Sequence, residues 1–341
     1  MTDIKLDFDT KALSNYLESK LSGFSGPLTA EKFAQGQSNP TFLITAASGK
    51  YVLRRKPPGK LLKSAHAVDR EYRVMSALAE TPVPVPATYL LCEDDSIIGS
   101  MFFLMEYVEG RVMWDPALPK LESSERGEIF DEMNRVLAAV HSVDIKATGL
   151  SDFGKPGNYF ERQVGRWTGQ YRATETEVLP EMDTIIEWLA TNTPEDDGRV
   201  ALVHGDYRLD NMIFHPTESR VVALVDWELS TLGHPFADLA YQCMQWRVKG
   251  GSIIPGLGDL DRELLGIPSE AAYIESYCKR MGISNIPNWN FYLVFSFFRL
   301  AAILQGVKKR ALDGNASNER ALQIGGLVKP LARMAAELVD P

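Results

Sequence analysis

The sequence predicts an α+β protein with two lobes: a small lobe around an antiparallel β-sheet, and a larger, mainly helical lobe. Runs of β-branched and aromatic residues, separated by turn residues, concentrate before about residue 110, and helical spacing of apolar residues dominates after it. The 341 residues, 45% of them hydrophobic and 24% charged, have an ordinary globular composition and suit roughly two domains. Strands followed by helices are typical of an α+β architecture.

The small lobe is predicted to contain one helix followed by two strand pairs. Ser48-Gly49-Lys50 is a hairpin signal, and Pro57 and Pro58 end the strand that follows it, because proline cannot donate to a sheet. The acidic turn Glu93-Asp94-Asp95 separates the second pair. The predicted helix covers residues 8–23, and the predicted strands cover 41–46, 51–55, 87–92 and 97–108.

A second helix is predicted between these strand pairs, from Ser64, a suitable N-cap, to Glu80. Val68, Tyr72 and Met75 form its apolar stripe, and Glu71 lies on or beside that buried face. A carboxylate in such a place needs a positive partner. The alternative is a glutamate at the solvent edge of the stripe.

From residue 111 onward the pattern is mainly helical, with one group of short strands. We expect lobes over 1–105 and 111–341, joined by a connector over 106–110. Helices are predicted at about 121–143, 159–173, 179–192, 239–249, 268–281, 288–308 and 318–338, and strands at 200–203, 211–214 and 221–226.

Charge and composition argue against several classes of protein. A net charge of −9 disfavours a nucleic-acid binder or a protein that binds anionic membranes. The most apolar run, 291–306, contains Arg299 and is too short to span a bilayer. Three scattered cysteines form no metal motif, and the acidic first ten residues lack the apolar core of a signal peptide, so we expect a cytoplasmic protein.

The strongest chemical signal lies in residues 201–228. His204-Gly205-Asp206 is followed by Asn211, which opens a short strand, and by Asp226, which closes the returning strand. The start of one antiparallel strand lies beside the end of the next, so Asn211 and Asp226 are predicted to share an ion, with Asp206 on a loop nearby. Oxygen ligands of this kind suit Mg²⁺.

Phosphoryl transfer requires such parts: a cation that neutralises phosphates, and a carboxylate that orients the attacking hydroxyl. The alternative for each residue alone is a turn-capping Asp or Asn, because both are common in turns. The spacing of the whole set favours the catalytic interpretation.

HGDxxxxN followed by VDWE resembles the catalytic core of the aminoglycoside phosphotransferase family, whose fold is similar to that of protein kinases. The resemblance covers roughly residues 25–310. GQSNPTFLI, GNYFERQVGRWTGQY and LVDWELSTLGHPFADLAY look most like the kinase-like domains associated with acyl-CoA dehydrogenases.

This resemblance implies roles for the matched residues. Asp206 would be the catalytic base, Asn211 and Asp226 would hold Mg²⁺, and ATP would be the phosphoryl donor. His204 would support the loop. Asp238 resembles a family aspartate that braces this loop, or it simply caps the following helix.

On the nucleotide side, the resemblance places Gly36, Ser38 and Asn39 in the loop over the phosphates, although this loop alone reads as an ordinary turn. Arg54 stands where protein kinases have a lysine, with Lys56 as the alternative phosphate contact and Glu71 as the partner.

The connector would be the hinge, where backbone groups of Glu106 and Val108 meet the adenine edge.

The acceptor is expected to be a small-molecule hydroxyl. The subgroup resemblance implies a hydroxyacyl-CoA or similar thioester, and Arg162 and Arg166, one helical turn apart among aromatic residues, could receive its phosphates. An aminoglycoside or amino-alcohol kinase, a nucleotide-binding pseudokinase and a protein kinase are the alternatives. The sequence does not determine the oligomeric state.

Overall fold

The structure, a computed structural model, describes residues 6–33, 39–57, 67–250, 253–314 and 320–339 and confirms the α+β class. The chain divides into two compact units. The first comprises Met1–Arg111, Ile213–Pro216 and Val222–Ser230, and the second comprises Val112–Met212, Thr217–Val221 and Thr231–Pro341. Two short segments from the later sequence therefore belong with the first unit, which a single boundary near residue 111 does not anticipate.

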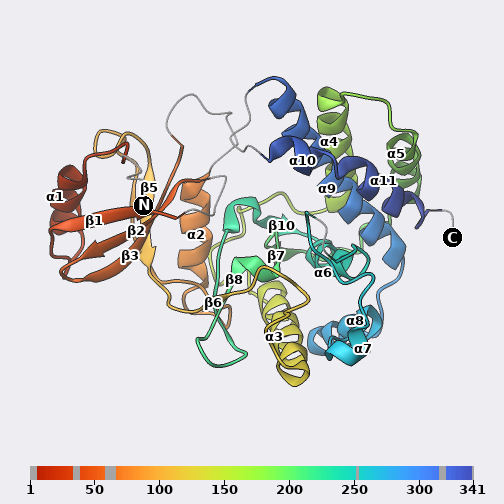
Figure 1. Ribbon diagram of the computed structural model, residues 1–341, viewed down its shortest axis with the longest axis horizontal. Helices are drawn as coiled ribbons and strands as arrows, with labels where there is room; N and C mark the ends of the chain where they lie inside the picture. Colours follow the sequence, from red (N-terminus) through yellow and green to blue (C-terminus); the bar gives the residue numbers. More distant parts are fainter. Residues whose placement is uncertain (1–5, 34–38, 58–66, 251–252, 315–319, 340–341) are drawn as a thin grey trace. The chain divides into compact units, whose positions relative to one another are not determined.

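The first unit is built on a five-stranded antiparallel sheet in the order β1-β2-β3-β5-β4 (Figure 1). The predicted hairpin is confirmed: Ala46 pairs with Gly49, whose φ of 138° suits glycine. The strands are β1 (Leu28–Lys32), β2 (Thr41–Ala46), β3 (Gly49–Arg55), β4 (Thr88–Cys92) and β5 (Phe102–Glu106).

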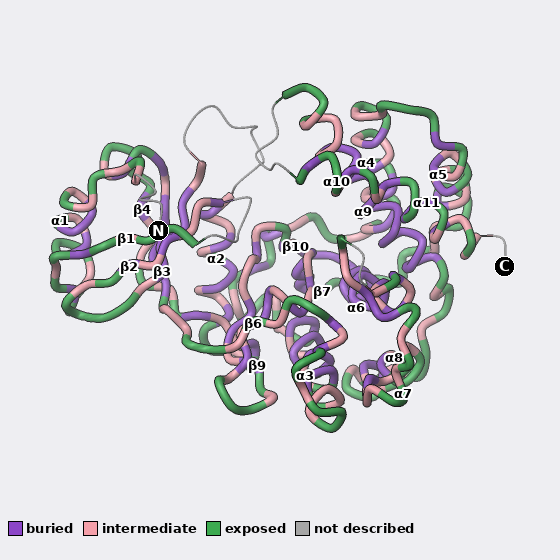
Figure 2. The backbone as a smooth tube through the Cα atoms, viewed as in Figure 1, coloured by how far each residue is buried: buried purple, intermediate pink, exposed green. Residues whose placement is uncertain are grey.

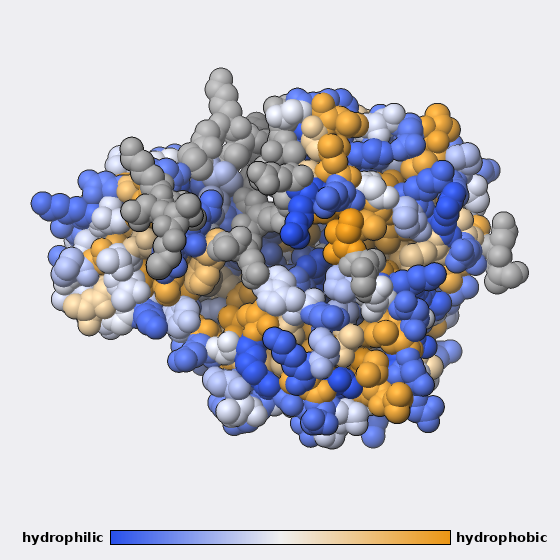
Figure 3. All heavy atoms as spheres, in the orientation of Figure 1, coloured by the Kyte–Doolittle hydropathy of each residue, from blue (hydrophilic) through white to orange (hydrophobic). Residues whose placement is uncertain are grey.

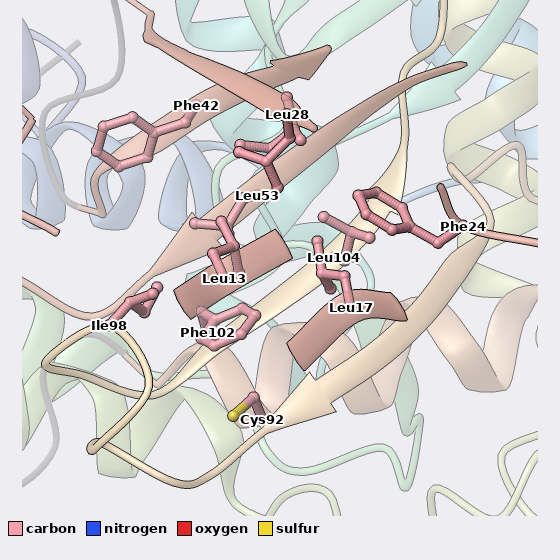
Figure 4. Packing of buried hydrophobic residues seen from close by; sticks show 11 residues of the cluster. Leu13, Leu17, Phe24, Leu28, Phe42, Leu53, Cys92, Ile98, Phe102 and Leu104 are labelled. Atoms are coloured by element: carbon pink, nitrogen blue, oxygen red, sulfur yellow. The ribbon is translucent and has the colours of Figure 1, made fainter. Parts of the chain in front are cut away.

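Helices cover both faces of this sheet. On one face, Leu13 and Leu17 of α1 (Thr10–Lys20) pack on the side chains of Leu53, Phe102 and Leu104 (Figure 4). On the other face, α2 (Val68–Leu78) packs against β4 and β5. The predicted N-cap of this helix, Ser64, lies outside the described residues. A sheet buried on both faces explains why β5 reads as an unbroken apolar run.

The two-residue period of β3 sends consecutive arginines to opposite faces. Arg55 lies on the α1 face, where it is 1% exposed, contacts Asp7 and donates to the carbonyl of Ile98 at 2.9 Å. Its guanidinium also lies over the rings of Phe8 and Phe42. Arg54 therefore points to the α2 face, as the pattern predicts.

The second unit is arranged around α9 (Trp289–Leu312), which contacts α4, α5, α6, α10 and α11. Buried residues gather along α3, α6 and α9 (Figure 2). Although α9 is long and apolar enough to cross a membrane, 83% of its most apolar window is buried inside the unit, which is typical of a core helix. The helices are α3 (Ser123–His141), α4 (Tyr159–Thr174), α5 (Pro180–Asn192), α6 (Phe236–Cys243), α7 (Arg262–Leu265), α8 (Glu270–Met281), α10 (Ala321–Gly325) and α11 (Val328–Ala336).

Short strands and 3₁₀ turns precede and follow the loop that carries Asp206 along the chain. β7 (Ala201–Val203) pairs antiparallel with β10 (Thr231–Gly233), a strand that the sequence pattern does not predict. A three-stranded sheet has the order β6-β8-β9, which confirms that the two predicted strands after Asp206 are neighbours. Its strands are β6 (Arg111–Val112), β8 (Met212–Phe214) and β9 (Val221–Leu224), and the 3₁₀ turns are η1 (Leu209–Asn211), η2 (Trp227–Leu229) and η3 (Met244–Trp246).

The prediction of one helix over 318–338 is wrong, because the chain forms α10, which ends at Gly325, and α11, which begins at Val328, with a break at Gly326 and Leu327. Glycine is a poor helix former, and Pro330 is tolerated only in the first turn of a helix. Because α11 begins at Val328, Pro330 lies in its first turn. Gly325 also packs closely on Lys308, where an added Cβ would come within 2.6 Å of a side-chain carbon.

The surface is mixed in polarity, as expected for a globular protein. Hydrophilic side chains cover most of the face drawn in Figure 3, with smaller apolar areas between them. The three cysteines are buried and form no disulfide.

Candidate active site

The loop that carries Asp206 begins at the end of β7 and depends on a glycine. Gly205 has a φ of 84°, a conformation that glycine adopts readily and other residues rarely do. The preceding residue, His204, is completely buried, and its Nδ1 accepts the backbone N–H of Asp206 at 3.2 Å. His204 therefore supports the loop from within.

The carboxylate of Asp238 braces this loop. It accepts the backbone N–H of His204 at 2.6 Å and that of Gly205 at 2.9 Å. His141 Nε2 lies 3.4 Å from the same carboxylate, and its Nδ1 lies 2.7 Å from the Tyr277 hydroxyl. Asp238 is thus a brace rather than a helix cap.

Burial of Asp238 disfavours its charge. The hydrogen bond and charge of His141, together with the Gly205 N–H, outweigh that effect and lower the pKa of Asp238.

Asp206 and Asn211 face each other across the loop. The Asn211 amide nitrogen donates to the backbone carbonyl of Asp206 at 2.9 Å and to its Oδ2 at 3.2 Å. Because both bonds use the amide nitrogen, the amide oxygen points away from Asp206. The Asp206 side chain is 24% exposed, so a ligand can reach its carboxylate.

Three residues that the sequence did not assign to the site also contact this loop. The Tyr241 hydroxyl donates to Asp206 Oδ1 at 2.8 Å, and Arg299 Nη2 donates to the Gly205 carbonyl at 2.6 Å. Arg208 Nε lies 3.9 Å from Asp206 Oδ1 and pairs mainly with Asp210. The one sequence signal was Arg299, a charge in an otherwise apolar helix.

A second cluster, in the first unit, surrounds Arg54. Its Nε lies 2.8 Å from Glu71 Oε2, which confirms the predicted pair; this is a close ion pair without the alignment of a good hydrogen bond. Its Nη2 contacts Asp226 Oδ1 and lies 3.6 Å from Glu228 Oε2. Glu228, which the sequence analysis did not select, also accepts from the buried Asn39 amide at 3.0 Å. One guanidinium thus faces three carboxylates.

This excess of negative charge acts on Glu71, which is 1% exposed. Burial raises the pKa of Glu71 to about 8; the Arg54 guanidinium and the Trp227 N–H oppose this rise, and the charges of Asp226 and Glu228 add to it. Arg54 stays protonated, because the surrounding carboxylates raise its pKa further. The cluster is therefore short of positive charge.

The residues present fit Mg²⁺. Asp226 uses one oxygen for Arg54 and keeps a side chain that is 31% exposed, and its φ of 68° is a left-handed conformation of the kind found at functional sites. Among the described residues no group of three or more His, Cys, Asp and Glu side chains could hold a metal. Mg²⁺ usually takes only one or two protein carboxylates and completes its shell with phosphates and water.

Asn211 directly precedes β8, and Asp226 follows the neighbouring strand β9 after one residue. Asn211 belongs to the second unit and Asp226 to the first. That these two side chains share one cation stays a prediction.

The remaining predicted nucleotide contacts have different outcomes. Gly36 and Ser38 lie outside the described residues. Lys56 Nζ lies 3.5 Å from Asp69 and is not part of the Arg54 cluster. The Glu106 N–H donates to the Ala87 carbonyl at 2.8 Å, so an adenine contact at Glu106 would have to use its carbonyl. Val108 is half-buried just after β5.

The basic helix α4 is partly core and partly surface. Trp167 and Tyr171 are buried, and Arg172 pairs with Asp183 at 2.5 Å. Arg162 and Arg166 line a pocket of about 560 Å³ together with Lys155, Gly157, Asn158, Glu161 and Gly165. A second pocket of about 570 Å³ shares Asn158, Glu161 and Gly165 and is mainly apolar, with Tyr159, Phe160, Val164, Ile186, Ala190 and Tyr292 in its lining.

Comparison with known proteins identifies the class of protein that carries these two clusters. The sequence profile of the phosphotransferase enzyme family matches residues 29–271. The chain belongs to this family, and its fold is that of the aminoglycoside phosphotransferases.

Among curated relatives, the chain is 52% identical over 326 residues to acyl-CoA dehydrogenase family member 10 of Mus musculus, covering 95% of the chain and 30% of that protein. It is 43% identical over 336 residues to acyl-CoA dehydrogenase family member 11 of Homo sapiens, covering 97% of the chain and 43% of that protein. The chain thus spans less than half the length of these relatives.

Solved structures agree on the fold. A Ralstonia eutropha JMP134 protein provisionally named an aminoglycoside phosphotransferase superposes with a TM-score of 0.89 at 52% identity, covering 97% of this chain and 98% of that one. Aminoglycoside phosphotransferase APH(4)-Ia, in a complex with ADP and hygromycin B, has a TM-score of 0.63 at 13% identity, covering 97% of this chain and 99% of that one.

The raised pKa of Glu71 predicts a pH effect on stability. Unfolded Glu71 titrates near pH 4.3, so between that pH and about 8 the folded state binds more protons, and stability falls as pH rises. Glu71→Gln should remove this fall in the free energy of unfolding, because glutamine does not titrate. Urea unfolding of the whole chain at pH 5.5 and pH 8.5 measures it.

Glu31→Gln, on the exposed strand β1, is the matched control and should keep the wild-type pH dependence. An unchanged pH dependence in Glu71→Gln would show that Glu71 is ionised throughout this range.

Proposed function

We propose that this chain transfers the γ-phosphoryl group of ATP to a hydroxyl of a small molecule, and that a hydroxyacyl-CoA is the acceptor. The observation that carries the reaction is the braced loop, in which both oxygens of Asp206 are oriented by hydrogen bonds and the Asn211 amide oxygen faces away for a metal. In phosphoryl transfer, catalysis consists mainly of positioning and electrostatic stabilisation.

Each residue has one task in this proposal. Asp206 orients the acceptor hydroxyl and takes its proton. Arg54 contacts the ATP phosphates and is held by Glu71. Asn211 and Asp226 hold Mg²⁺, which when bound neutralises charge on the phosphates.

The two adjoining pockets along α4 support the choice of acceptor. The basic pocket offers Lys155 and Arg166 to phosphate groups, and Arg162, which donates to the Lys155 carbonyl at 2.5 Å, adds positive charge beside them. The apolar pocket offers an aromatic and aliphatic surface to an acyl chain. A CoA thioester combines these two chemistries. The curated relatives that contain a segment matching this chain are named acyl-CoA dehydrogenase family members, and these names also point to a CoA thioester.

The test is ATP consumption by the purified protein against 3- and 4-hydroxyacyl-CoAs, aminoglycosides and amino alcohols. Asp206→Asn should lower acceptor-dependent turnover by about 10²–10⁴-fold, because general-base catalysis contributes roughly that much. Its thermal unfolding midpoint should stay near that of the wild type.

Asp313→Asn, an exposed residue paired with Lys309, should keep full turnover. Full turnover in Asp206→Asn would remove Asp206 as the base. Turnover with aminoglycosides alone would reject the CoA thioester, and ATP binding without any turnover would favour a pseudokinase.

The phosphate contact is tested by comparing two basic residues of the first unit. Arg54→Ala should lower kcat/KM for ATP by about 10–100-fold, because a charge-assisted hydrogen bond contributes roughly 1.5–3 kcal/mol. Lys56→Ala should change it by less than about threefold, since among the described residues Lys56 pairs with Asp69 and lies outside the Arg54 cluster. Arg54→Lys keeps a positive charge among the three carboxylates and serves as the variant that preserves folding; the reverse order of effects would assign the phosphates to Lys56.

The acceptor pocket is tested by Arg166→Gln. The KM for a hydroxyacyl-CoA should rise about 5–10-fold, since one charged contact contributes roughly 1 kcal/mol or more, and the KM for ATP should not change. Arg172→Gln, on the same helix but paired with Asp183, is the control. The matching hydroxyacyl-pantetheine lacks the CoA phosphates, so its KM should be insensitive to Arg166→Gln; equal effects on both acceptors would contradict a phosphate site here.

A further inference from the structure

The backbone of Gly205, immediately before Asp206, is held at both of its polar groups. Its N–H donates to Asp238 at 2.9 Å, and its carbonyl accepts from Arg299 at 2.6 Å. Gly205 has a positive φ, a backbone conformation that favours glycine. A rotation of this peptide would move the Asp206 side chain directly.

Arg299 is an unusual residue for its place in the fold. It lies in the middle of the core helix α9 and is only 8% exposed. Among the described residues no carboxylate lies within ion-pair distance of it; its guanidinium lies over the rings of Trp167, at 5.7 Å, and Tyr241, at 5.5 Å. Burying a guanidinium without a counter-charge is expensive, so this arrangement needs a reason beyond packing.

The second aromatic partner of Arg299 reaches the catalytic carboxylate. The Tyr241 hydroxyl donates to Asp206 Oδ1 at 2.8 Å, while Asn211 donates to Oδ2 at 3.2 Å. Burial raises the pKa of Tyr241 well above its usual value, so the hydroxyl stays protonated and remains a donor. Arg208 is the other charged group near Asp206, at 3.9 Å, and it is paired with Asp210.

We propose that Arg299 and Tyr241 are positioning residues that hold the Asp206 carboxylate in its working orientation. Arg299 acts twice, by fixing the Gly205 carbonyl and by clamping the Tyr241 ring, and Tyr241 fixes one carboxylate oxygen. Neither residue is assigned contact with ATP or the acceptor. This inference rests on the proposed role of Asp206 as the base.

Kinetics of three variants provide the first test. Tyr241→Phe should lower kcat about 10-fold and Arg299→Met about 100-fold, because a misplacement of about 1 Å costs up to 10²-fold in rate. Arg299→Lys, which keeps the charge and one donor, should recover part of the loss. The KM for ATP should stay within about twofold in all three, a separation that general destabilisation would not produce.

A double-mutant cycle separates positioning from stability. In the Asp206→Asn background, Tyr241→Phe should change the residual turnover by less than about twofold, because its partner is already altered. Tyr207→Phe is the control: it loses a similar buried hydrogen bond, from its hydroxyl to the Met133 carbonyl at 2.6 Å, and should keep wild-type kcat. Independent, multiplicative losses would overturn the proposal.

A crystal structure of Tyr241→Phe tests the inference without any turnover. The Asp206 carboxylate should leave its wild-type rotamer or adopt more than one. If it keeps its single orientation against Asn211, the positioning role is rejected even where the enzyme is active. If the wild type shows no transfer to any acceptor but the carboxylate does move, the proposed reaction fails and the positioning role stands.

Discussion

The site in the second unit depends on one buried carboxylate. Asp238 is 1% exposed and accepts two consecutive backbone N–H groups, those of His204 and Gly205. These donors belong to a turn that no regular secondary structure satisfies, and a buried N–H without a partner costs about 1–3 kcal/mol. By satisfying both, Asp238 stabilises the one loop conformation in which Asp206 and Asn211 can face each other. The brace comes from α6, more than thirty residues further along the chain, so the loop is defined only in the folded unit.

The cluster in the first unit follows a different electrostatic principle. The two Asp206 carboxylate oxygens each accept a hydrogen bond, from Tyr241 and from Asn211. Arg54, in contrast, faces three carboxylates and leaves negative charge uncompensated. Such an arrangement is poor for stability but favourable for binding a cation, because the cation relieves repulsion that already exists. Hydrogen bonds to each oxygen suit a carboxylate that must keep one orientation, as Asp206 must. A deficit of positive charge suits a cluster that must bind a cation, as in the cluster around Arg54.

Membership of the family says less about the substrate than about the type of reaction. Structures that share the fold at 13–18% identity include aminoglycoside and macrolide phosphotransferases, so the fold accommodates chemically different acceptors. The pockets along α4 are lined by residues other than those of the loop around Asp206.

The sequence by itself determined the fold class, most of the elements and the residues of the braced loop, because these depend on local patterns: the two-residue period of strands, the helical spacing of apolar residues and the spacing from Asp206 to Asn211. The alternation along β3 placed Arg54 and Arg55 on opposite faces, and the family resemblance named Glu71 as the partner of Arg54. Only the tertiary structure revealed Glu228, Tyr241 and Arg299, because each meets its partner through space, and Arg299 lies 94 residues from the carbonyl that it binds. The break between α10 and α11 was missed for a related reason, since apolar spacing continues through a pair of glycines and only backbone geometry and close packing end the helix there.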